Sequence, residues 1–574
     1  MRRLGAALLL APALAVAQLR PSQPDNPTGS RPQQLAIAQR HMVAAGHPLA
    51  VEAGLKMLDR GGNAIDAMIA TQLVLNLVEP SSSGLGGGAF LLFHDASAGK
   101  LHAIDGRETA PAGATPDLFT TDGGKPLAFR TARGSGISVG TPGTPRLLEV
   151  AHARFGKLAW KELFQPAIEL AERGFPVSER LHRQIESEQI PWNDAARAYF
   201  LGPDGKPKPI GTTLKNPQFA ATLRALAAGG ADAFYSGDIA RDIVAAVQGH
   251  GARGGSLSAD DLKGYRVRDV EAVCGKYRTW KVCGMPPSSS GGVAVLQILG
   301  ALERFDLASV RPNSSESVHL KAEAERLAFA DRGRYLGDDR FVDVPVAGLI
   351  DPAYIASRSR QIARDKSMGV AMAGNPQGVR AAYRDDAHDE IPGTSHISIV
   401  DSAGNGVSMT TTIEGNFGNG TMVRGFLLNN ELTDFNFVPV EGGLLTANAL
   451  APGKRPRSSM APTMVFDARG RLELLAGSPG GSLIIGYVAK ALIATLDWNL
   501  DPQQAIDLPN FGSRNGPTEV EQGTQLEGVI ASLKSMGHEV RAIPLTSGLQ
   551  VIRRVPQGWQ GGSDPRREGV ARGR

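Results

Sequence analysis

The feature that most constrains this chain is a polar stretch, residues 385–393, that gives way abruptly to alternating apolar and polar residues. The alternation begins at Thr394, and a period of two is typical of a β-strand with one buried face. Turn-forming residues follow at 401–406, and a second β-rich segment covers 407–414. The sequence therefore predicts an exposed loop that leads into an antiparallel β-hairpin.

The expected register of this hairpin brings two threonines together. We align Val400 with Val407 across the turn. Thr394 then lies opposite Ile413 and beside Thr412. A slip of one residue would change the facing pair, but the two threonines would remain neighbours at the open end of the hairpin.

A threonine at the start of a strand usually has only a structural role, but an N-terminal threonine carries its own base. The hydroxyl is a weak nucleophile alone, and an α-amino group with a pKa of about 7.7 to 8.0 can activate it. Cleavage of the Gly393–Thr394 bond would create that amine. At this boundary the residues alone are compatible with either role.

The order of the remaining patterns predicts an α+β fold. Helical periodicity dominates the chain before about residue 391, and short strands with glycine-rich turns dominate after it. Gly61-Gly62 is expected to end one helix, and Asn63 to cap a mostly buried helix over 64–78. The Arg/Gly-rich segment 565–574 is expected to be a frayed tail.

Charge and composition exclude several classes of protein. The chain has 61 basic and 57 acidic residues, a net charge of +4, and no long basic run, which argues against a nucleic-acid partner. A content of 42% hydrophobic and 21% charged residues indicates a packed globular protein. The glycine-rich segment 81–88 lacks the Lys-Ser/Thr of a phosphate loop, so tight backbone packing explains it better than a nucleotide site.

The N-terminus has the pattern of an export signal. Two arginines precede the apolar run 4–17, which ends in Ala-Val-Ala, so residues 1–17 are predicted to be a cleaved signal peptide. This run is too short for a transmembrane helix, and no later stretch lacks charges for the required length. Residues 18–38 predict a disordered leader. We expect a periplasmic or secreted protein with no stable membrane span.

The chain has two cysteines, Cys274 and Cys283, in a segment that alternates like two strands around a turn. In an exported protein such a hairpin favours a disulfide, and two inert thiols are the alternative. Neither possibility involves catalysis.

The loop before the hairpin and the first strand contain several residue types that can bind metal ions. Loop carboxylates are usually only solvated, and the group lacks the regular spacing of a catalytic zinc motif, so we predict no metal site. The residues concerned are Asp385, Asp386, His388, Asp389, Glu390 and His396.

A series of motifs extends over nearly the whole mature chain, roughly 41–569. In order they are Gly61-Gly-Asn-Ala-Ile-Asp66, Gly84-Leu-Gly-Gly-Gly88, Asp105-Gly-Arg-Glu-Thr-Ala-Pro111, Pro142-Gly143, Thr394-Ser-His396, Asn429-Asn-Glu-Leu-Thr-Asp-Phe435, Lys454-Arg-Pro-Arg-Ser-Ser-Met460, Gly477-Ser-Pro-Gly-Gly481 and Asp564-Pro-Arg-Arg567. With these motifs the chain resembles the γ-glutamyltransferase (γ-glutamyl transpeptidase) family of N-terminal-nucleophile hydrolases. The resemblance implies a four-layer αββα sandwich and self-cleavage at Gly393–Thr394. Residues 39–393 would form the large chain and 394–574 the small chain of one intertwined structural unit.

The resemblance also implies a role for each matching residue. Thr394 would be the nucleophile, and Thr412 would orient it. Arg107 would bind the substrate α-carboxylate, since a planar guanidinium can hold a carboxylate bidentately; the alternative is a surface arginine paired with Glu108 or Asp105. Of the others, Glu431 and Asp434 would accept the α-ammonium, Ser458 and Ser459 would contact the α-carboxylate, and backbone N–H groups of Gly480 and Gly481 would form the oxyanion hole. No cofactor is implied, because the nucleophile supplies its own base.

Two departures from the family pattern bear on specificity. Glu414 stands where the best-known members have Asn, so three carboxylates could surround one ammonium. The stretch from Asp434 to Ser458 is shorter than in members with a covering lid and contains no Tyr. A more open pocket would admit water and bulkier acyl groups, which favours hydrolysis over transfer.

The sequence therefore predicts a self-processing γ-glutamyl hydrolase or transpeptidase. It would act on glutathione and related γ-glutamyl amides through an acyl-threonine intermediate, with water or an amine as acceptor. A cephalosporin (glutaryl) acylase-like amidase of the same family is one alternative. A non-catalytic exported solute-binding protein is the alternative of another class.

Overall fold

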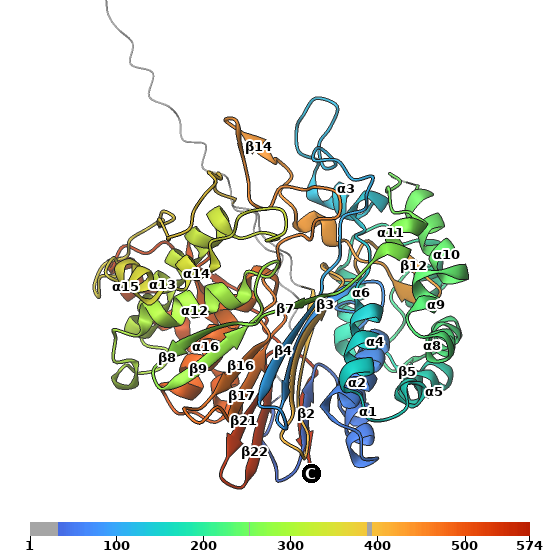
Figure 1. Cartoon of the computed structure of the whole chain (residues 1–574), viewed down its shortest axis with the longest axis horizontal. Coiled ribbons are helices and arrows are strands. Elements are labelled where there is room, and N and C mark those ends of the chain that lie inside the picture. Colours follow the sequence, from blue (N-terminus) through green and yellow to red (C-terminus); the bar gives the residue numbers. More distant parts are fainter. Residues whose placement is uncertain (1–31, 252, 387–392) are drawn as a thin grey trace, which may run out of the picture.

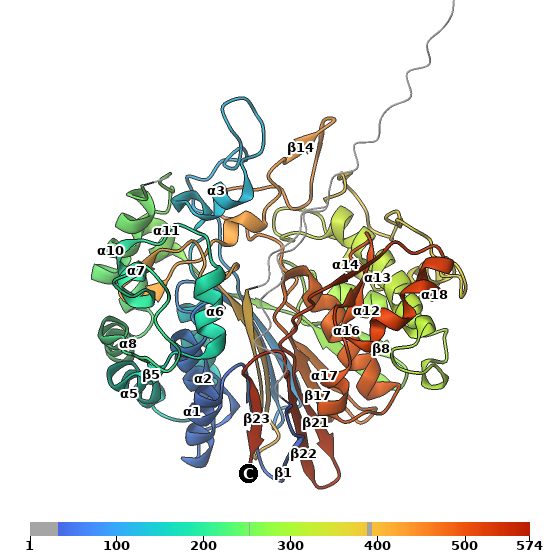
Figure 2. The same cartoon turned by 180° about the vertical axis from the view of Figure 1, so that it is seen from behind.

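The computed structural model describes residues 32–251, 253–386 and 393–574 of the chain. The predicted signal peptide and residues 18–31 of the predicted leader lie outside the described residues. The end of the leader was wrongly predicted to be disordered, because Ala36–Ala38 form a β-strand that pairs with residues 559–561. Two seven-stranded antiparallel sheets stack at the centre, and helices cover the outer side of each (Figure 1 and Figure 2). This is the expected four-layer αββα sandwich, and the α+β prediction is confirmed.

Both sheets combine strands from before and after the Gly393–Thr394 bond. The first sheet runs in the order β23 (Val570–Gly573), β2 (Met42–Ala45), β10 (Thr394–Val400), β11 (Gly406–Thr412), β3 (Gly88–Asp95), β4 (Lys100–Gly106) and β7 (Arg268–Val270). The second runs in the order β1 (Ala36–Ala38), β22 (Gly558–Ser563), β21 (Gln550–Val555), β17 (Leu472–Gly477), β16 (Thr463–Phe466), β9 (Trp280–Gly284) and β8 (Val273–Tyr277). The two halves of the chain therefore share each sheet.

Helices from the first part of the chain cover the first sheet. Asn63 and Asp66 form a capping box at the start of α2, which is buried along its whole length, as predicted. Its apolar side chains pack against Ile397 and Ile399 of β10. The longer helices on this side include α1 (Pro48–Asp59), α2 (Ala64–Val78), α4 (Thr144–Phe155), α5 (Gln165–Arg173), α6 (Glu179–Ser187), α8 (Pro217–Gly229) and α10 (Gly237–Gln248).

A second group of helices covers the other sheet. Of these, α12 (Gly291–Leu302), α16 (Ile484–Leu496) and α17 (Pro502–Asp507) pack directly on it, and α13 (Ser315–Tyr335) and α15 (Pro352–Ser359) pack on α12. A small sheet of β18 (Phe511–Gly512), β19 (Thr518–Glu521) and β20 (Val540–Ile543) lies beyond α13. Among the described helices, none is both long enough and apolar enough to span a membrane.

The hairpin of β10 and β11 forms as predicted, but its register differs from the expected one by one residue. Val400 pairs with Gly406, and Thr394 therefore lies directly opposite Thr412. The cause is the turn, in which the Asp401 carboxylate accepts hydrogen bonds from the backbone N–H groups of Ala403 and Asn405. This side-chain bonding closes the loop over 401–405 and sets the first strand pair at Gly406.

The C-terminal segment is not a frayed tail, and that prediction is wrong. Its residues form β23, which pairs with β2 at the edge of the first sheet. The two cysteines face each other across β8 and β9, where Cys274 and Cys283 are joined by a disulfide with a Cα–Cα distance of 4.1 Å.

Candidate active site

Thr394 begins β10 on the face that looks towards the second sheet, and its hydroxyl is directed at the bond that precedes it. Thr394 Oγ1 donates to the carbonyl oxygen of Gly393 at 2.7 Å, and Thr412 Oγ1 donates to the same oxygen at 2.6 Å. The two hydroxyl oxygens are 3.4 Å apart. The backbone N–H of Glu414 donates to Thr412 Oγ1 at 2.8 Å, which fixes the second hydroxyl in place. Two hydroxyls thus polarise one carbonyl, and one belongs to the residue that follows it.

Close packing explains why Gly precedes Thr394. A Cβ atom at Gly393 would overlap the backbone of Glu414 and Gly415. Packing also accounts for the glycine-rich segment, because a Cβ atom at Gly87 would overlap the carbonyl of Thr412. The prediction that this segment serves backbone packing agrees with these contacts.

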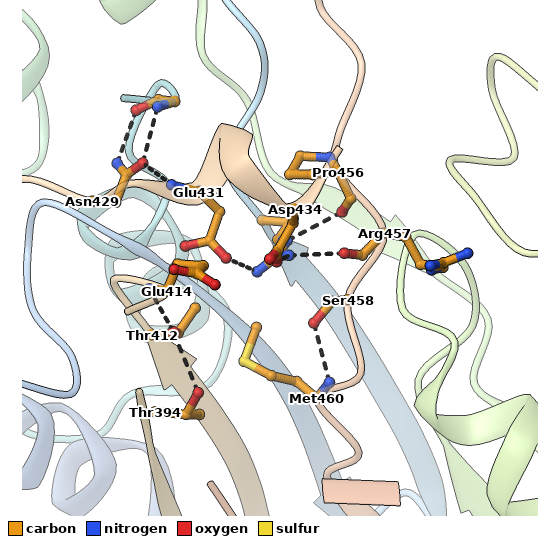
Figure 3. A network of polar contacts seen from close by, with 12 residues as sticks. Thr394, Thr412, Glu414, Asn429, Glu431, Asp434, Pro456, Arg457, Ser458 and Met460 are labelled. Atoms are coloured by element: carbon orange, nitrogen blue, oxygen red, sulfur yellow. Dashed lines mark hydrogen bonds and ion pairs between the residues drawn. The ribbon is translucent and has the colours of Figure 1, made fainter. Parts of the chain in front are cut away.

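Arg107 follows β4 and is buried, with 1% of its surface exposed, which excludes the surface-arginine alternative. Its guanidinium forms ion pairs with Glu431 and Asp434, both in the short 3-10 helix Glu431–Asp434. It also donates to the carbonyl oxygens of Pro456 at 3.2 Å and Arg457 at 3.0 Å. Figure 3 shows Glu431 and Asp434, the two carboxylates of these ion pairs, above Thr394 and Thr412. The structure therefore gathers one buried cation and two carboxylates beside the threonine pair.

Burial raises the pKa of two carboxyl groups in this group. The pKa of Glu431 lies well above its usual range because the side chain is fully buried, with Glu108, Asp434 and Glu414 adding repulsion that Arg107 partly offsets. Burial likewise raises the pKa of Glu108 to about 7, again against the attraction of Arg107. The site therefore holds more carboxyl groups than the neighbouring guanidinium can keep ionised.

Glu414 lies directly after β11 in a left-handed backbone conformation, with φ of 72°. Its side chain is buried and accepts a hydrogen bond from the amide of Asn430. Figure 3 shows its carboxylate between Thr412 and Glu431. Glu414, Glu431 and Asp434, the three carboxylates that the sequence suggested around one ammonium, are therefore neighbours in space.

The two serines of the segment that follows Arg457 have different partners. Ser458 Oγ accepts from the backbone N–H of Met460 at 3.1 Å and lies near Asp434 in Figure 3. Ser459 Oγ accepts instead from Arg332 of α13 at 2.8 Å. Successive side chains of an extended segment point to opposite sides, so Ser459 points towards α13 and Ser458 points the other way.

Gly480 and Gly481 lie where a short 3-10 helix, Gly481–Leu483, leads into α16. The first N–H groups of a helix have no acceptor within it and can face an anion. Both residues have positive φ angles, 141° and 57°, and a Cβ atom at Gly480 would lie 2.7 Å from Cε2 of Tyr487. Only glycine fits this turn without strain.

The described residues of the loop before β10 that could bind a metal ion each have other partners in the structure. Asp385 pairs with Arg334, and Asp386 pairs with Arg457. His396 is buried in β10, where its Nδ1 lies 2.8 Å from Thr410 Oγ1, and burial lowers its pKa to about 3. His388, Asp389 and Glu390 lie outside the described residues.

Several residues that support the site were not singled out from the sequence. Asn429 donates to the carbonyls of Gly86 and Gly140 and accepts from the N–H of Glu431, which fixes the start of the 3-10 helix. Its place two residues before Glu431 in the same motif was the signal that the sequence offered.

A second support lies behind the nucleophile. The buried Arg567 donates to the carbonyl oxygen of Thr394 at 3.3 Å and pairs with Glu79, which accepts from Ser395 Oγ at 2.6 Å. Arg567 is the last residue of the motif Asp564-Pro-Arg-Arg567, whereas Glu79, at the end of α2, gave no sequence signal.

Comparison with known proteins identifies the family to which this arrangement belongs. The model of the family Gamma-glutamyltranspeptidase matches residues 50–573. The chain belongs to the γ-glutamyltranspeptidase family. It is 39% identical over 525 residues to a glutathione hydrolase proenzyme of Bacillus subtilis (strain 168), with 90% of this chain and 88% of the relative covered.

Acylases are also among the similar proteins. An acylase ACY 1 proenzyme of Pseudomonas sp. (strain SE83) is 36% identical over 538 residues, which cover 91% of each chain. The crystal structure of a cephalosporin acylase from Bacillus halodurans superimposes with a TM-score of 0.83 at 28% identity, over 95% of this chain and 98% of that one. Like the rest of its family, this protein is an N-terminal-nucleophile enzyme of the γ-glutamyl hydrolase and transferase class.

Proposed function

We propose that this protein hydrolyses glutathione and related γ-glutamyl amides after cutting itself at Gly393–Thr394. The observation that carries the proposal is the buried ion pair of Arg107 with Glu431 and Asp434 beside Thr394. A guanidinium next to carboxylates is complementary to an α-amino acid zwitterion. The α-carboxylate of the substrate pairs with Arg107, and its α-ammonium pairs with Glu431 and Asp434. The net charge of the site therefore stays the same when the substrate binds.

Self-cleavage begins with the contact between Thr394 Oγ1 and the Gly393 carbonyl. The hydroxyl oxygen attacks the carbonyl carbon, and Thr412 stabilises the oxygen on which negative charge develops. The C–N bond breaks and the leaving nitrogen takes up the proton that the hydroxyl loses, which gives an ester on Thr394 and a free α-amine. Water then hydrolyses the ester. The products are a large chain that ends at Gly393 and a small chain that begins with Thr394.

The free amine of Thr394 then acts as the base for catalysis. It accepts the hydroxyl proton as Oγ1 attacks the γ-amide carbonyl of the substrate. The N–H groups of Gly480 and Gly481, at a helix start, stabilise the tetrahedral oxyanion. The intermediate expels the amine of the substrate, which takes up the proton, and leaves the γ-glutamyl group as an ester on Thr394. Water or an amino acid then accepts that group.

An acylase activity towards glutaryl amides is the second candidate. The observation that favours it is the stretch from Asp434 to Ser458, which is shorter than in members with a covering lid and would admit bulkier acyl groups. The similarity to the cephalosporin acylase of Bacillus halodurans and to the acylase of Pseudomonas agrees with this candidate.

We also propose that the protein is exported to the periplasm or the medium. The disulfide between Cys274 and Cys283 supports export, because structural disulfides persist in oxidising compartments. The predicted signal peptide at residues 1–17 supplies the route.

Self-cleavage and substrate preference can be tested together. Purified protein should give two bands on a denaturing gel, and N-terminal sequencing should find Thr394 at the start of the smaller chain. Thr394→Ala should remain one chain without activity. γ-Glutamyl and glutaryl p-nitroanilides should then be compared on the processed enzyme. An intact wild-type chain after long incubation, or a new N-terminus other than Thr394, would refute the mechanism.

A further inference from the structure

Glu108 is a buried carboxyl group at the substrate site that the proposed mechanism does not use. It follows Arg107 directly, and it has no solvent exposure. The start of β3 makes room for its carboxyl group, because a Cβ atom at Gly88 would overlap Oε2 of Glu108. On another side its Cβ lies close to Gly140. The chain therefore packs glycines around an acidic side chain that an apolar residue could have replaced.

The carboxyl group that acts on Glu108 across the site is that of Glu431. The charge of Glu108 repels that of Glu431, the residue that pairs with Arg107 through Oε1. Both side chains are fully buried, and within the described residues no hydrogen-bond partner reaches either oxygen of Glu108 or Oε2 of Glu431. Ionised carboxylates can only accept hydrogen bonds, and a buried ionised group without a partner is costly, so the buried pair retains a proton.

The groups that face this pair do not remove the need for that proton. Arg107 is the cation that acts on both carboxyl groups, while Asp105 adds repulsion at Glu108 and Asp434 and Glu414 add repulsion at Glu431. The hydroxyl of Tyr265 donates a hydrogen bond to the carbonyl of Arg107. Burial raises the pKa of this hydroxyl, so Tyr265 stays neutral. Asp105 has its own partner in Arg455. The surroundings of the pair are thus acidic on balance.

We propose that Glu108 and Glu431 share one proton in the empty site and release it when a substrate ammonium binds. This inference rests on the proposed function, because it assigns the ammonium to the acidic side of the site. The bound ammonium donates hydrogen bonds and brings positive charge, so it replaces the proton and favours the fully ionised pair. Glu108 is then a positioning residue that tunes recognition through Glu431 without touching the substrate.

Proton release has a consequence for selectivity. By linkage, the affinity for a ligand with an ammonium rises with pH while the pair still holds its proton, by up to about tenfold per pH unit. A ligand without the ammonium gains nothing from ionisation of the pair. The enzyme would therefore discriminate better between γ-glutamyl and glutaryl groups as the pH rises towards 8.

L-Glutamate and glutarate form a matched pair of probes, since they differ only by the α-ammonium. Binding of each to the processed wild-type enzyme is measured by titration calorimetry at pH 7 in two buffers with different enthalpies of ionisation. The difference in apparent enthalpy gives the number of protons released. We expect release of up to one proton with L-glutamate and none with glutarate. Equal release with both ligands, or none with either, would overturn the proposal.

Glu108→Gln tests whether Glu108 holds the proton. The amide has the same size and donates permanently to Glu431, so L-glutamate should still bind, but with little proton release and a flatter pH profile. Glu52→Gln, an exposed change on α1, is the matched control and should release protons like the wild type. Undiminished release in Glu108→Gln would refute the role of Glu108.

The outcomes separate this proposal from the proposed function. If Glu108→Gln fails to fold or to cleave itself, the comparison of the two ligands on the wild type still decides whether a proton is released. If neither ligand competes with a γ-glutamyl anilide, the proposed function falls, and this inference falls with it. Binding of L-glutamate without proton release overturns only the shared proton.

Discussion

Replacement of Arg107 by lysine tests the centre of the proposed site. The guanidinium contacts Glu431 and Asp434 and donates to two backbone carbonyls, those of Pro456 and Arg457. A lysine ammonium keeps the charge, but its single nitrogen cannot reproduce this planar set of contacts or hold a substrate carboxylate bidentately. The variant should therefore fold and lose recognition.

The size of the effect follows from the bonds that are lost. A hydrogen bond to a charged group contributes about 1.5 to 3 kcal/mol, and lysine loses at least one such bond to the substrate carboxylate. At about 1.4 kcal/mol for each factor of ten, kcat/KM for a γ-glutamyl anilide should fall about 10- to 150-fold.

The assay compares two anilides on wild type and Arg107→Lys. The 4-aminobutyryl anilide keeps the ammonium of the γ-glutamyl anilide but lacks its α-carboxylate, so it should be a poor substrate that the variant handles almost as well as the wild type. Self-cleavage on a gel reports on folding. An equal loss on both substrates would mean that Arg107 acts structurally, through Glu431 and Asp434, and would refute carboxylate recognition.

Two further predictions concern the acidic cluster and the helix start. Glu414→Asn should improve γ-glutamyl turnover near neutral pH, because it removes a carboxylate beside Glu431; release of glutamate and formation of γ-glutamyl-glycylglycine measure hydrolysis and transfer. Efficient transfer by the wild type with lower activity in this variant would instead make Glu414 a productive ligand. Gly480→Ala should lower kcat at least about tenfold, because strain of about 1 to 3 kcal/mol and the contact with Tyr487 displace the N–H groups. Gly470→Ala, also at positive φ but in open space, is its control, and equal kcat values in the two variants would contradict an oxyanion role.

Local patterns were sufficient to predict the hairpin and the buried helix. The alternation from Thr394 and the cap at Asn63 both act within a few residues, so each is visible in the sequence. The register was predicted one residue away from the observed one, because the side chain of Asp401 closes the turn. Side-chain bonds inside a loop leave no periodic signal.

Contacts between distant segments could not be predicted from local patterns. The Arg/Gly-rich C-terminus has no strand pattern of its own, and it becomes β23 because the edge of β2 is available for pairing. Arg107 meets Glu431 across 324 positions, and only the family resemblance suggested that they meet. The electrostatic coupling of Glu108 to Glu431 had no sequence signal, because its cause is the burial of both side chains beside Arg107.

The sharing of both sheets by the two parts of the chain has a consequence for how the mature enzyme unfolds. Before cleavage, refolding is an event within one molecule and does not depend on concentration. After cleavage, each part carries only some strands of each sheet, so neither can complete a core without the other. Reassembly then becomes a bimolecular reaction between two chains with exposed strand edges, which are prone to aggregate. The proposed cut at Gly393–Thr394 would thus make the lifetime of the folded enzyme depend on how slowly it unfolds rather than on its ability to refold.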